Sequence, residues 1–99
     1  MRDWRIEWND AAIDDLNYIR AYISERNPAA AERVAKRIIS GTRLLRITPY
    51  MGRSGRVAGT REFVFADIPY IAIYCVREDE MVTEILTVIH TSRLWPRDD

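Results

Sequence analysis

Three strand-like runs in the C-terminal half of the chain constrain its fold more than any other feature. They cover residues 59–65, 69–76 and 81–90. Two of them are rich in β-branched and aromatic residues, which suit a pleated, half-buried surface. The third is the longest and most apolar, so we expect it to be central. Short turns between the runs predict an antiparallel meander. Arg61 opens the first strand and His90 closes the third, so they should lie towards opposite ends of the sheet.

The N-terminal part of the chain predicts a strand and a helix. Residues 4–8 alternate apolar and charged side chains, as a strand with one buried face does. So short a strand should lie at a sheet edge or be completed by pairing with a later strand. Asn9 and Asp10 can cap a helix over residues 10–25. Its apolar positions are Ala12, Leu16, Ile19 and Ile23, with Ile13 and Tyr22 beside them.

A second helix is predicted to begin at Pro28, with Asn27 as its cap, and to end at Pro49. Its apolar stripe consists of Ala31, Val34, Ala35, Ile38 and Leu45. Gly41 lies in its interior, where glycine costs ~1 kcal/mol relative to alanine, and marks either a kink or a close approach to the first helix. The short link between the helices makes them antiparallel neighbours.

Residues 49–60 form a long irregular stretch with three glycines and one proline. Loops of this length inside compact domains are often functional. The predicted element order is therefore β-α-α-β-β-β. It describes a single α+β domain over residues 1–99, in which a helical hairpin packs on one face of a mostly antiparallel sheet of three to four strands.

Several classes of protein are not expected. No apolar run approaches the ~20 residues that span a bilayer, and the first residues lack the apolar core of a signal peptide. Cys75 is the single cysteine and lies in an apolar strand, which favours a reducing, cytoplasmic setting. With one histidine and one cysteine we expect no metal site. Residues 52–55 lack the lysine of a phosphate-binding loop, so no cofactor is expected either.

The charged residues are segregated, although the formal net charge is zero. Eight basic residues and no acidic residue lie between positions 33 and 61: Arg33, Lys36, Arg37, Arg43, Arg46, Arg53, Arg56 and Arg61. Acidic residues cluster at 14–15, 78–80 and 98–99. The basic band is either a binding surface for an anionic partner or a solvated helix face with a basic loop.

His90 is the one side chain suited to proton transfer near neutral pH, which suggests metal-free RNA cleavage as one possible chemistry. Such cleavage also needs cations on the phosphate, for which the candidates are Arg61, Arg93, Arg53 and Arg56. Tyr50, Tyr70 and Trp95 could stack on bases. The alternative for each is structural: a hydrogen-bonded histidine, an arginine in an ion pair with a residue such as Glu84, and a tryptophan that anchors the tail.

The sequence resembles the ParE branch of the RelE/ParE toxins of bacterial type II toxin–antitoxin systems. The stretches that carry the resemblance span nearly the whole chain: Ala12-x-x-Asp15-Leu16-x-x-Ile19-x-x-Tyr22-Ile23, Asn27-Pro28-x-Ala30-Ala31, Pro49-x-x-Gly52-Arg53-x-Gly55-Arg56-Val57-x-Gly59-Thr60-Arg61-Glu62, Pro69-Tyr70-Ile71-x-x-Tyr74, and Ile85-Leu86-x-Val88-Ile89-His90-x-x-Arg93-x-Trp95-Pro96. The order and spacing of these stretches are specific, rather than any single motif.

The resemblance implies a toxin that a ParD-like antitoxin neutralises by folding along the helical hairpin towards the sheet. Residues expected to contact the antitoxin are Leu16, Ile19, Tyr22, Ile23, Val34, Arg37, Ile38, Arg53, Arg56 and Arg61. Antitoxin tails of this family are disordered until bound, so a large wrapped surface must offset their ordering entropy. The basic band would suit acidic side chains of such a tail.

The resemblance also divides the possible targets. ParE-like members poison DNA gyrase and RelE-like members cut mRNA on the ribosome. We favour gyrase, because a neutral protein lacks the many cations that binding ribosomal RNA draws on. No residue is then catalytic, Arg93 and Trp95 are candidates for contacting the target, and no sequence-specific DNA binding is expected of this chain alone. On the nuclease alternative the site comprises His90, Arg61 and Arg93. A third alternative is a non-toxic interaction module of the same fold.

Overall fold

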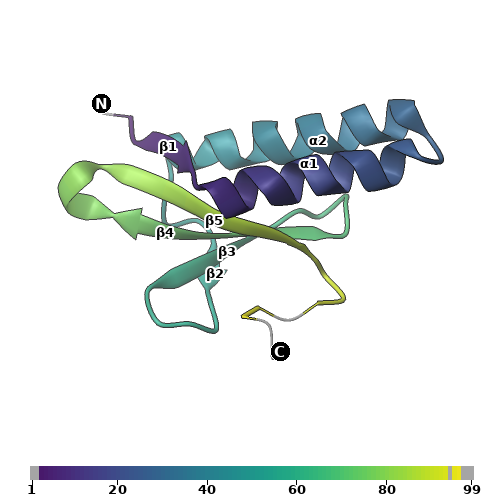
Figure 1. Cartoon of the computed structure of the whole chain (residues 1–99). Helices are drawn as coiled ribbons and strands as arrows, with labels where there is room; N and C mark the ends of the chain where they lie inside the picture. Colours follow the sequence, from purple (N-terminus) through teal and green to yellow (C-terminus); the bar gives the residue numbers. More distant parts are fainter. Residues whose placement is uncertain (1–2, 94, 97–99) are drawn as a thin grey trace.

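The computed structural model describes residues 3–93 and 95–96, and shows a helical hairpin lying across one face of a twisted sheet (Figure 1). The acidic residues at 98–99 lie outside the described part. The elements, in chain order, are β1 (Arg5–Trp8), α1 (Asp10–Ser24), α2 (Pro28–Thr42), the short 3-10 helix η1 (Arg43–Arg46), β2 (Arg53–Ser54), β3 (Thr60–Val64), β4 (Tyr70–Arg77), the 3-10 turn η2 (Glu78–Glu80) and β5 (Val82–His90).

The sheet has five strands in the order β1-β5-β4-β3-β2. The three pairs from β2 to β5 are antiparallel, and β1 lies parallel to β5 at one edge, which confirms that the N-terminal strand is completed by a later one. The prediction of three to four strands was too low, because the two-residue β2 forms within the glycine-containing loop and pairs with β3. The central strand is β4 rather than β5.

Both helices begin where the sequence predicts, because each has an asparagine cap. The side-chain oxygen of Asn9 accepts from the Ala12 amide at 2.9 Å, and that of Asn27 accepts from the Ala30 amide at 3.0 Å. The prediction that the second helix runs to Pro49 was wrong. The α-helix ends at Thr42, and the chain tightens into η1, which still buries Leu45.

Gly41 marks a close approach, but to Phe65 after β3 rather than to the first helix. A Cβ atom on Gly41 would collide with a ring carbon of Phe65, which is 3% exposed. The core lies between the helices and the sheet and is built from residues of both layers: Ala12, Ile19, Ile38, Leu45, Phe63, Phe65, Tyr70, Ala72, Tyr74, Ile85 and Val88. Neither helix in the described ranges is long and apolar enough to cross a membrane.

The path of β1 leaves half of β5 without a neighbour on one side. β1 pairs with β5 only from Val82 to Ile85, and the Asn9 amide then donates to the Ile85 carbonyl at 3.1 Å as the chain turns into α1. From residue 86 to 90, the side of β5 away from β4 therefore faces α1 rather than a described strand. This open edge lines a cleft beside α1.

Candidate functional site

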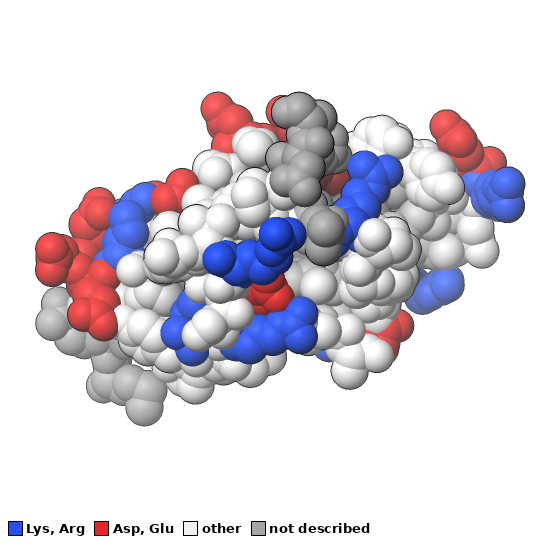
Figure 2. All heavy atoms as spheres, turned by 90° about the horizontal axis from the view of Figure 1, so that it is seen from below, with Lys and Arg blue, Asp and Glu red and all other residues white. Residues whose placement is uncertain are grey.

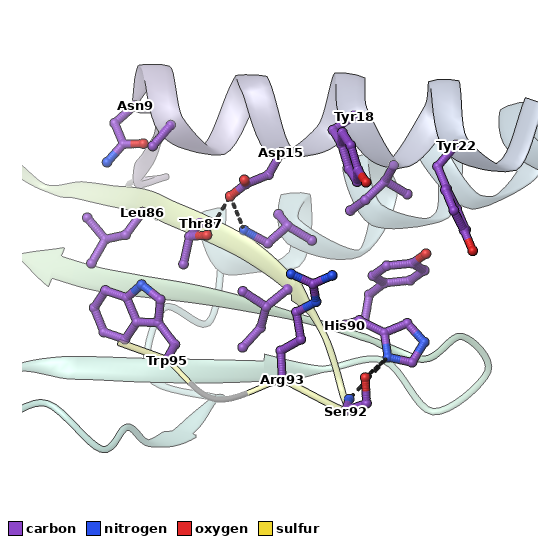
Figure 3. A pocket seen from close by; sticks show the side chains of 15 residues that line it. Asn9, Asp15, Tyr18, Tyr22, Leu86, Thr87, His90, Ser92, Arg93 and Trp95 are labelled. Carbon is purple, nitrogen blue, oxygen red and sulfur yellow. Dashed lines mark hydrogen bonds between the residues drawn. The ribbon is translucent and has the colours of Figure 1, made fainter. Parts of the chain in front are cut away.

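A cleft of about 840 Å³ lies between α1, the open edge of β5 and the chain that returns after His90 (Figure 3). Side chains from all three segments line it: Asn9, Asp15, Tyr18, Ile19 and Tyr22 from α1 and its cap; Leu86, Thr87, Val88, Ile89 and His90 from β5; and Ser92, Arg93 and Trp95 from the returning chain. The buried ring of Tyr70 on β4 completes the wall. The volume falls in the range of small-molecule sites.

Asp15 connects α1, which forms the roof of the cleft, to the open edge of β5. Its carboxylate accepts hydrogen bonds from the Thr87 hydroxyl and, at 3.0 Å, from the Val88 amide (Figure 3). The Val88 amide points to the open side of β5, where no strand accepts it. Asp15 therefore satisfies a polar group that would otherwise be left unpaired in a part-buried position.

The roof of the cleft carries two exposed aromatic rings. Tyr18 and Tyr22 are 67% and 63% exposed, and their rings stack with centroids 6.4 Å apart and planes 16° from parallel. They are four residues apart on α1, so they lie one turn apart on the same face. A face that keeps two aromatic rings in water is suited to binding another flat or apolar group.

His90 and Tyr70 form the inner wall. Their rings meet edge to face, with centroids 5.3 Å apart and an interplanar angle of 83°. Burial raises the pKa of the Tyr70 phenol, and the nearby Tyr22 phenol raises it further. The Ser92 amide donates to His90 Nδ1 at 3.1 Å, and the Ser92 hydroxyl lies 2.9 Å from the same nitrogen. Because Nδ1 accepts, the Nε2 atom carries the ring proton.

The returning chain brings the two predicted target-contact residues to this cleft. Figure 3 shows Arg93 extending towards α1, while Trp95 lies beneath Leu86. Arg93 is exposed and Trp95 is half-buried. Arg93 forms no ion pair with any of the residues that the structure describes. Within those residues there is also no group of three or more histidine, cysteine, aspartate or glutamate side chains placed to hold a metal ion.

Arg61 lies at the other end of the sheet, as predicted. It pairs in register with Tyr74, whereas His90 pairs with Tyr70, so the two rows are about 13 Å apart along β4. Its guanidinium donates to the carbonyls of Gly52 and Tyr50, at 3.0 Å each, and lies over the Tyr50 ring at 5.4 Å. Arg61 does not form the expected ion pair with Glu84, because Glu84 pairs with Arg77 instead. Arg61 therefore does not converge with His90 and Arg93, and its guanidinium binds the glycine-containing loop instead.

The hairpin residues expected to contact an antitoxin fall into three groups. Ile19 and Ile38 are 7% and 0% exposed and pack in the core, so they are not available to a partner in this conformation, which corrects that expectation. Leu16, Ile23 and Val34 are half-buried against the same core. Tyr22 is exposed and lines the cleft.

The basic residues of the expected interface are partly engaged within the chain. Arg37 donates to both carboxylate oxygens of Asp67, at 2.8 and 3.0 Å, and these hydrogen bonds lower the Asp67 pKa from its ordinary value of 3.8. Arg53 pairs with Glu62 at 2.7 Å. Arg56 is exposed and has no ion pair among the described residues. On the sheet face away from the helices, basic side chains gather near the middle and the acids of η2 at one end (Figure 2).

Tyr18 and Asp15 are among the cleft residues that sequence reasoning missed. Tyr18 could have been found, because its spacing from Tyr22 predicts a shared helix face. The sequence presents Asp15 only as part of the acidic cluster at 14–15, and its bonds to Thr87 and Val88 depend on where β1 stops pairing with β5. Single-sequence patterns do not specify that point.

Comparison with known proteins places the fold and the sequence in one family. The model of a family described as the ParE toxin of the type II toxin–antitoxin system parDE matches residues 6–95. A Sinorhizobium fredii protein named "Putative toxin Y4kP" is 45% identical over 93 residues, which cover 94% of each chain. Toxin RelE2 of Caulobacter vibrioides is 33% identical over 90 residues, which cover 91% of this chain and 98% of that protein.

Solved structures support the same placement at the level of the fold. A chain of the chromosomal ParDE system from P. aeruginosa superposes with a TM-score of 0.80 at 21% identity, covering 88% of this chain and 95% of that one. A chain of the RelBE2 toxin–antitoxin complex from Mycobacterium tuberculosis gives 0.61 at 18% identity, covering 94% and 97%. From the family match and the two relatives, we conclude that this chain belongs to the ParE toxin family of type II toxin–antitoxin systems.

Proposed function

We propose that this toxin acts in the cytoplasm by binding and inhibiting DNA gyrase, and that a ParD-like antitoxin neutralises it. The observation that carries the gyrase proposal is the separation of Arg61 from His90. A nuclease needs its base and its phosphate-binding cations around one scissile bond. Here Arg61 hydrogen-bonds to loop carbonyls at one end of the sheet, and His90 bonds to Ser92 at the other. That arrangement supports inhibition by binding.

The charge of the chain also favours a protein target. A formal net charge of zero, with the exposed acids of η2 on one end, gives little attraction to ribosomal RNA. In the proposed complex, Arg93 and Trp95 contact the target from the cleft, and no residue is catalytic.

The antitoxin contact is proposed for the exposed and half-buried members of the expected set. Tyr22 offers an exposed ring, and Leu16, Ile23 and Val34 offer partly covered apolar surface. Arg56 offers a cation for an acidic side chain, while Arg37, Arg53 and Arg61 would have to exchange or share internal partners. Solved structures of similar fold include the RelBE2 and RelBE toxin–antitoxin complexes, which supports an antitoxin partner.

Two assays on purified toxin test the target. In a gyrase supercoiling assay we expect loss of supercoiling or trapped cleavage complexes, and both should be reversed by the antitoxin. In a translating ribosome assay we expect mRNA to remain intact. Normal supercoiling at excess toxin, together with cleaved mRNA, would replace the gyrase proposal with the nuclease one.

A RelE-like nuclease is the second candidate, because His90 and Arg93 line one cleft and one relative is named Toxin RelE2. If it is correct, ribosome-bound mRNA is cut by the native toxin and not by His90→Ala. The third candidate, a non-toxic interaction module, predicts that induction without the antitoxin leaves growth unchanged.

A further inference from the structure

The cleft between α1 and β5 combines exposed aromatic faces with the guanidinium of Arg93, which has no ion pair among the residues that the structure describes. Tyr18 and Tyr22 hold a stacked, solvent-exposed pair on the roof, and Arg93 reaches in from the returning chain (Figure 3). His90 lies on the inner wall, backed by the buried Tyr70 ring. A ligand that satisfies all these groups has a flat aromatic part and an anionic part.

We propose that this cleft binds one nucleotide, with its base stacked on the Tyr18–Tyr22 pair and its phosphate held by Arg93 and His90. Aromatic side chains stack on any base, because every base has a π-face. A guanidinium donates to phosphate oxygens through two parallel N–H groups. The Ser92 amide occupies His90 Nδ1, which leaves Nε2–H as a second donor.

The acidic residue of the cleft does not oppose this ligand. The Asp15 carboxylate accepts from the Thr87 hydroxyl and the Val88 amide, so part of its charge is compensated where it sits. It lies on the wall towards β5, whereas the tyrosine rings project from the following turns of α1 (Figure 3).

An extended peptide could also bind to an open strand edge, by adding a strand to the sheet. Strand addition uses the outward amides of the edge, and the Val88 amide, in the middle of the open part of β5, is already bound to Asp15. A nucleotide needs none of these amides. The exposed aromatic pair and the Arg93 guanidinium are also better matched to a base and a phosphate than to a peptide backbone.

Titration of the isolated toxin with thymidine 5′-monophosphate and with the single strand (dT)4 tests this proposal, followed by NMR shifts of the His90 ring and the Trp95 indole. We expect both probes to shift these signals saturably. Equal affinities would identify a free nucleotide as the ligand, and tighter binding of (dT)4 would identify a single strand. A lack of shifts at millimolar probe would overturn the proposal, whatever the supercoiling assay shows.

Matched variants locate the site. The double variant Y18A/Y22A removes two exposed rings and should keep the fold by circular dichroism while weakening binding at least about fivefold. Arg93→Gln should weaken binding and reduce its salt dependence. The controls, Ile47→Ala and Arg33→Gln, change an exposed apolar side chain and an exposed cation outside the cleft and should bind as the native toxin does. Equal losses in variants and controls, or peptide binding in the cleft with no nucleotide binding, would contradict the assignment.

Discussion

Asp15 shows how one carboxylate connects residues far apart in the sequence. It accepts from Thr87 and Val88, which lie 72 and 73 positions away, and so attaches α1 to the open edge of β5. Asp15→Ala would leave two donors without an acceptor in a part-buried place. We predict a loss of about 1–3 kcal/mol in the free energy of unfolding, measured by urea denaturation. Asp14→Ala, the exposed neighbour, should stay within about 0.5 kcal/mol; equal losses would mean that the bonds to β5 contribute nothing.

The Arg37–Asp67 pair predicts a pH effect. The hydrogen bonds from Arg37 lower the pKa of Asp67 in the folded state, so the stability that the pair contributes is present above pH 3.8 and is lost as the pH falls through the lower folded pKa. In Arg37→Gln, NMR titration of the Asp67 carboxyl should give a pKa closer to 3.8. An unchanged pKa in this variant would show that the contact is not held in solution.

Among the helices and strands, local sequence chemistry predicted the first residues of an element better than its last residues. The asparagine caps of α1 and α2, the β3–β5 meander and the edge strand β1 follow from residue type and period. The end of α2 at Thr42 does not follow from residue type or period. The packing of η1, and not the position of Pro49, determines where this helix ends. The two residues of β2 lie in a glycine-containing loop, where pairing with β3 overrides local preference.

Gly41 tests the packing of α2 against the sheet. In an exposed helix, glycine to alanine stabilises by about 1 kcal/mol. Here the added methyl group meets the Phe65 ring, which is buried and packed in the core. We therefore predict that Gly41→Ala destabilises by about 1–3 kcal/mol in urea denaturation. Ser40→Ala, on the exposed side of the same turn, is the control; a stabilised Gly41→Ala protein would show that this approach is looser than described.

At the scale of the whole molecule, the structure separates residues that hold the fold from residues that can meet a partner. Periodicity identified the apolar faces of the hairpin, but it cannot say which side of a two-layer domain each residue faces. Ile38 therefore appeared among the expected antitoxin contacts although it is fully buried. In the same way, His90 and Arg93 share a cleft and Arg61 does not, because sheet register sets these positions.

Two variants test which residues hold the fold and which can meet a partner. Ile38→Ala should lower the free energy of unfolding by about 2–5 kcal/mol, because it opens a cavity in the core. Tyr22→Ala should change it by less than about 0.5 kcal/mol and weaken antitoxin binding at least about tenfold, since its exposed ring is available to the partner. Titration calorimetry with the antitoxin checks the second effect, and native affinity in Tyr22→Ala would exclude the roof of the cleft from the interface.

Growth arrest by the variant His90→Asn distinguishes a toxin that acts by binding from one that cleaves RNA. The asparagine oxygen can accept from the Ser92 amide in place of Nδ1, but an amide cannot transfer a proton near neutral pH. Induced without antitoxin, and at equal folded protein level, His90→Asn should arrest growth as strongly as the native toxin. Normal growth under those conditions would contradict inhibition by binding, because it would make proton transfer by His90 necessary for toxicity.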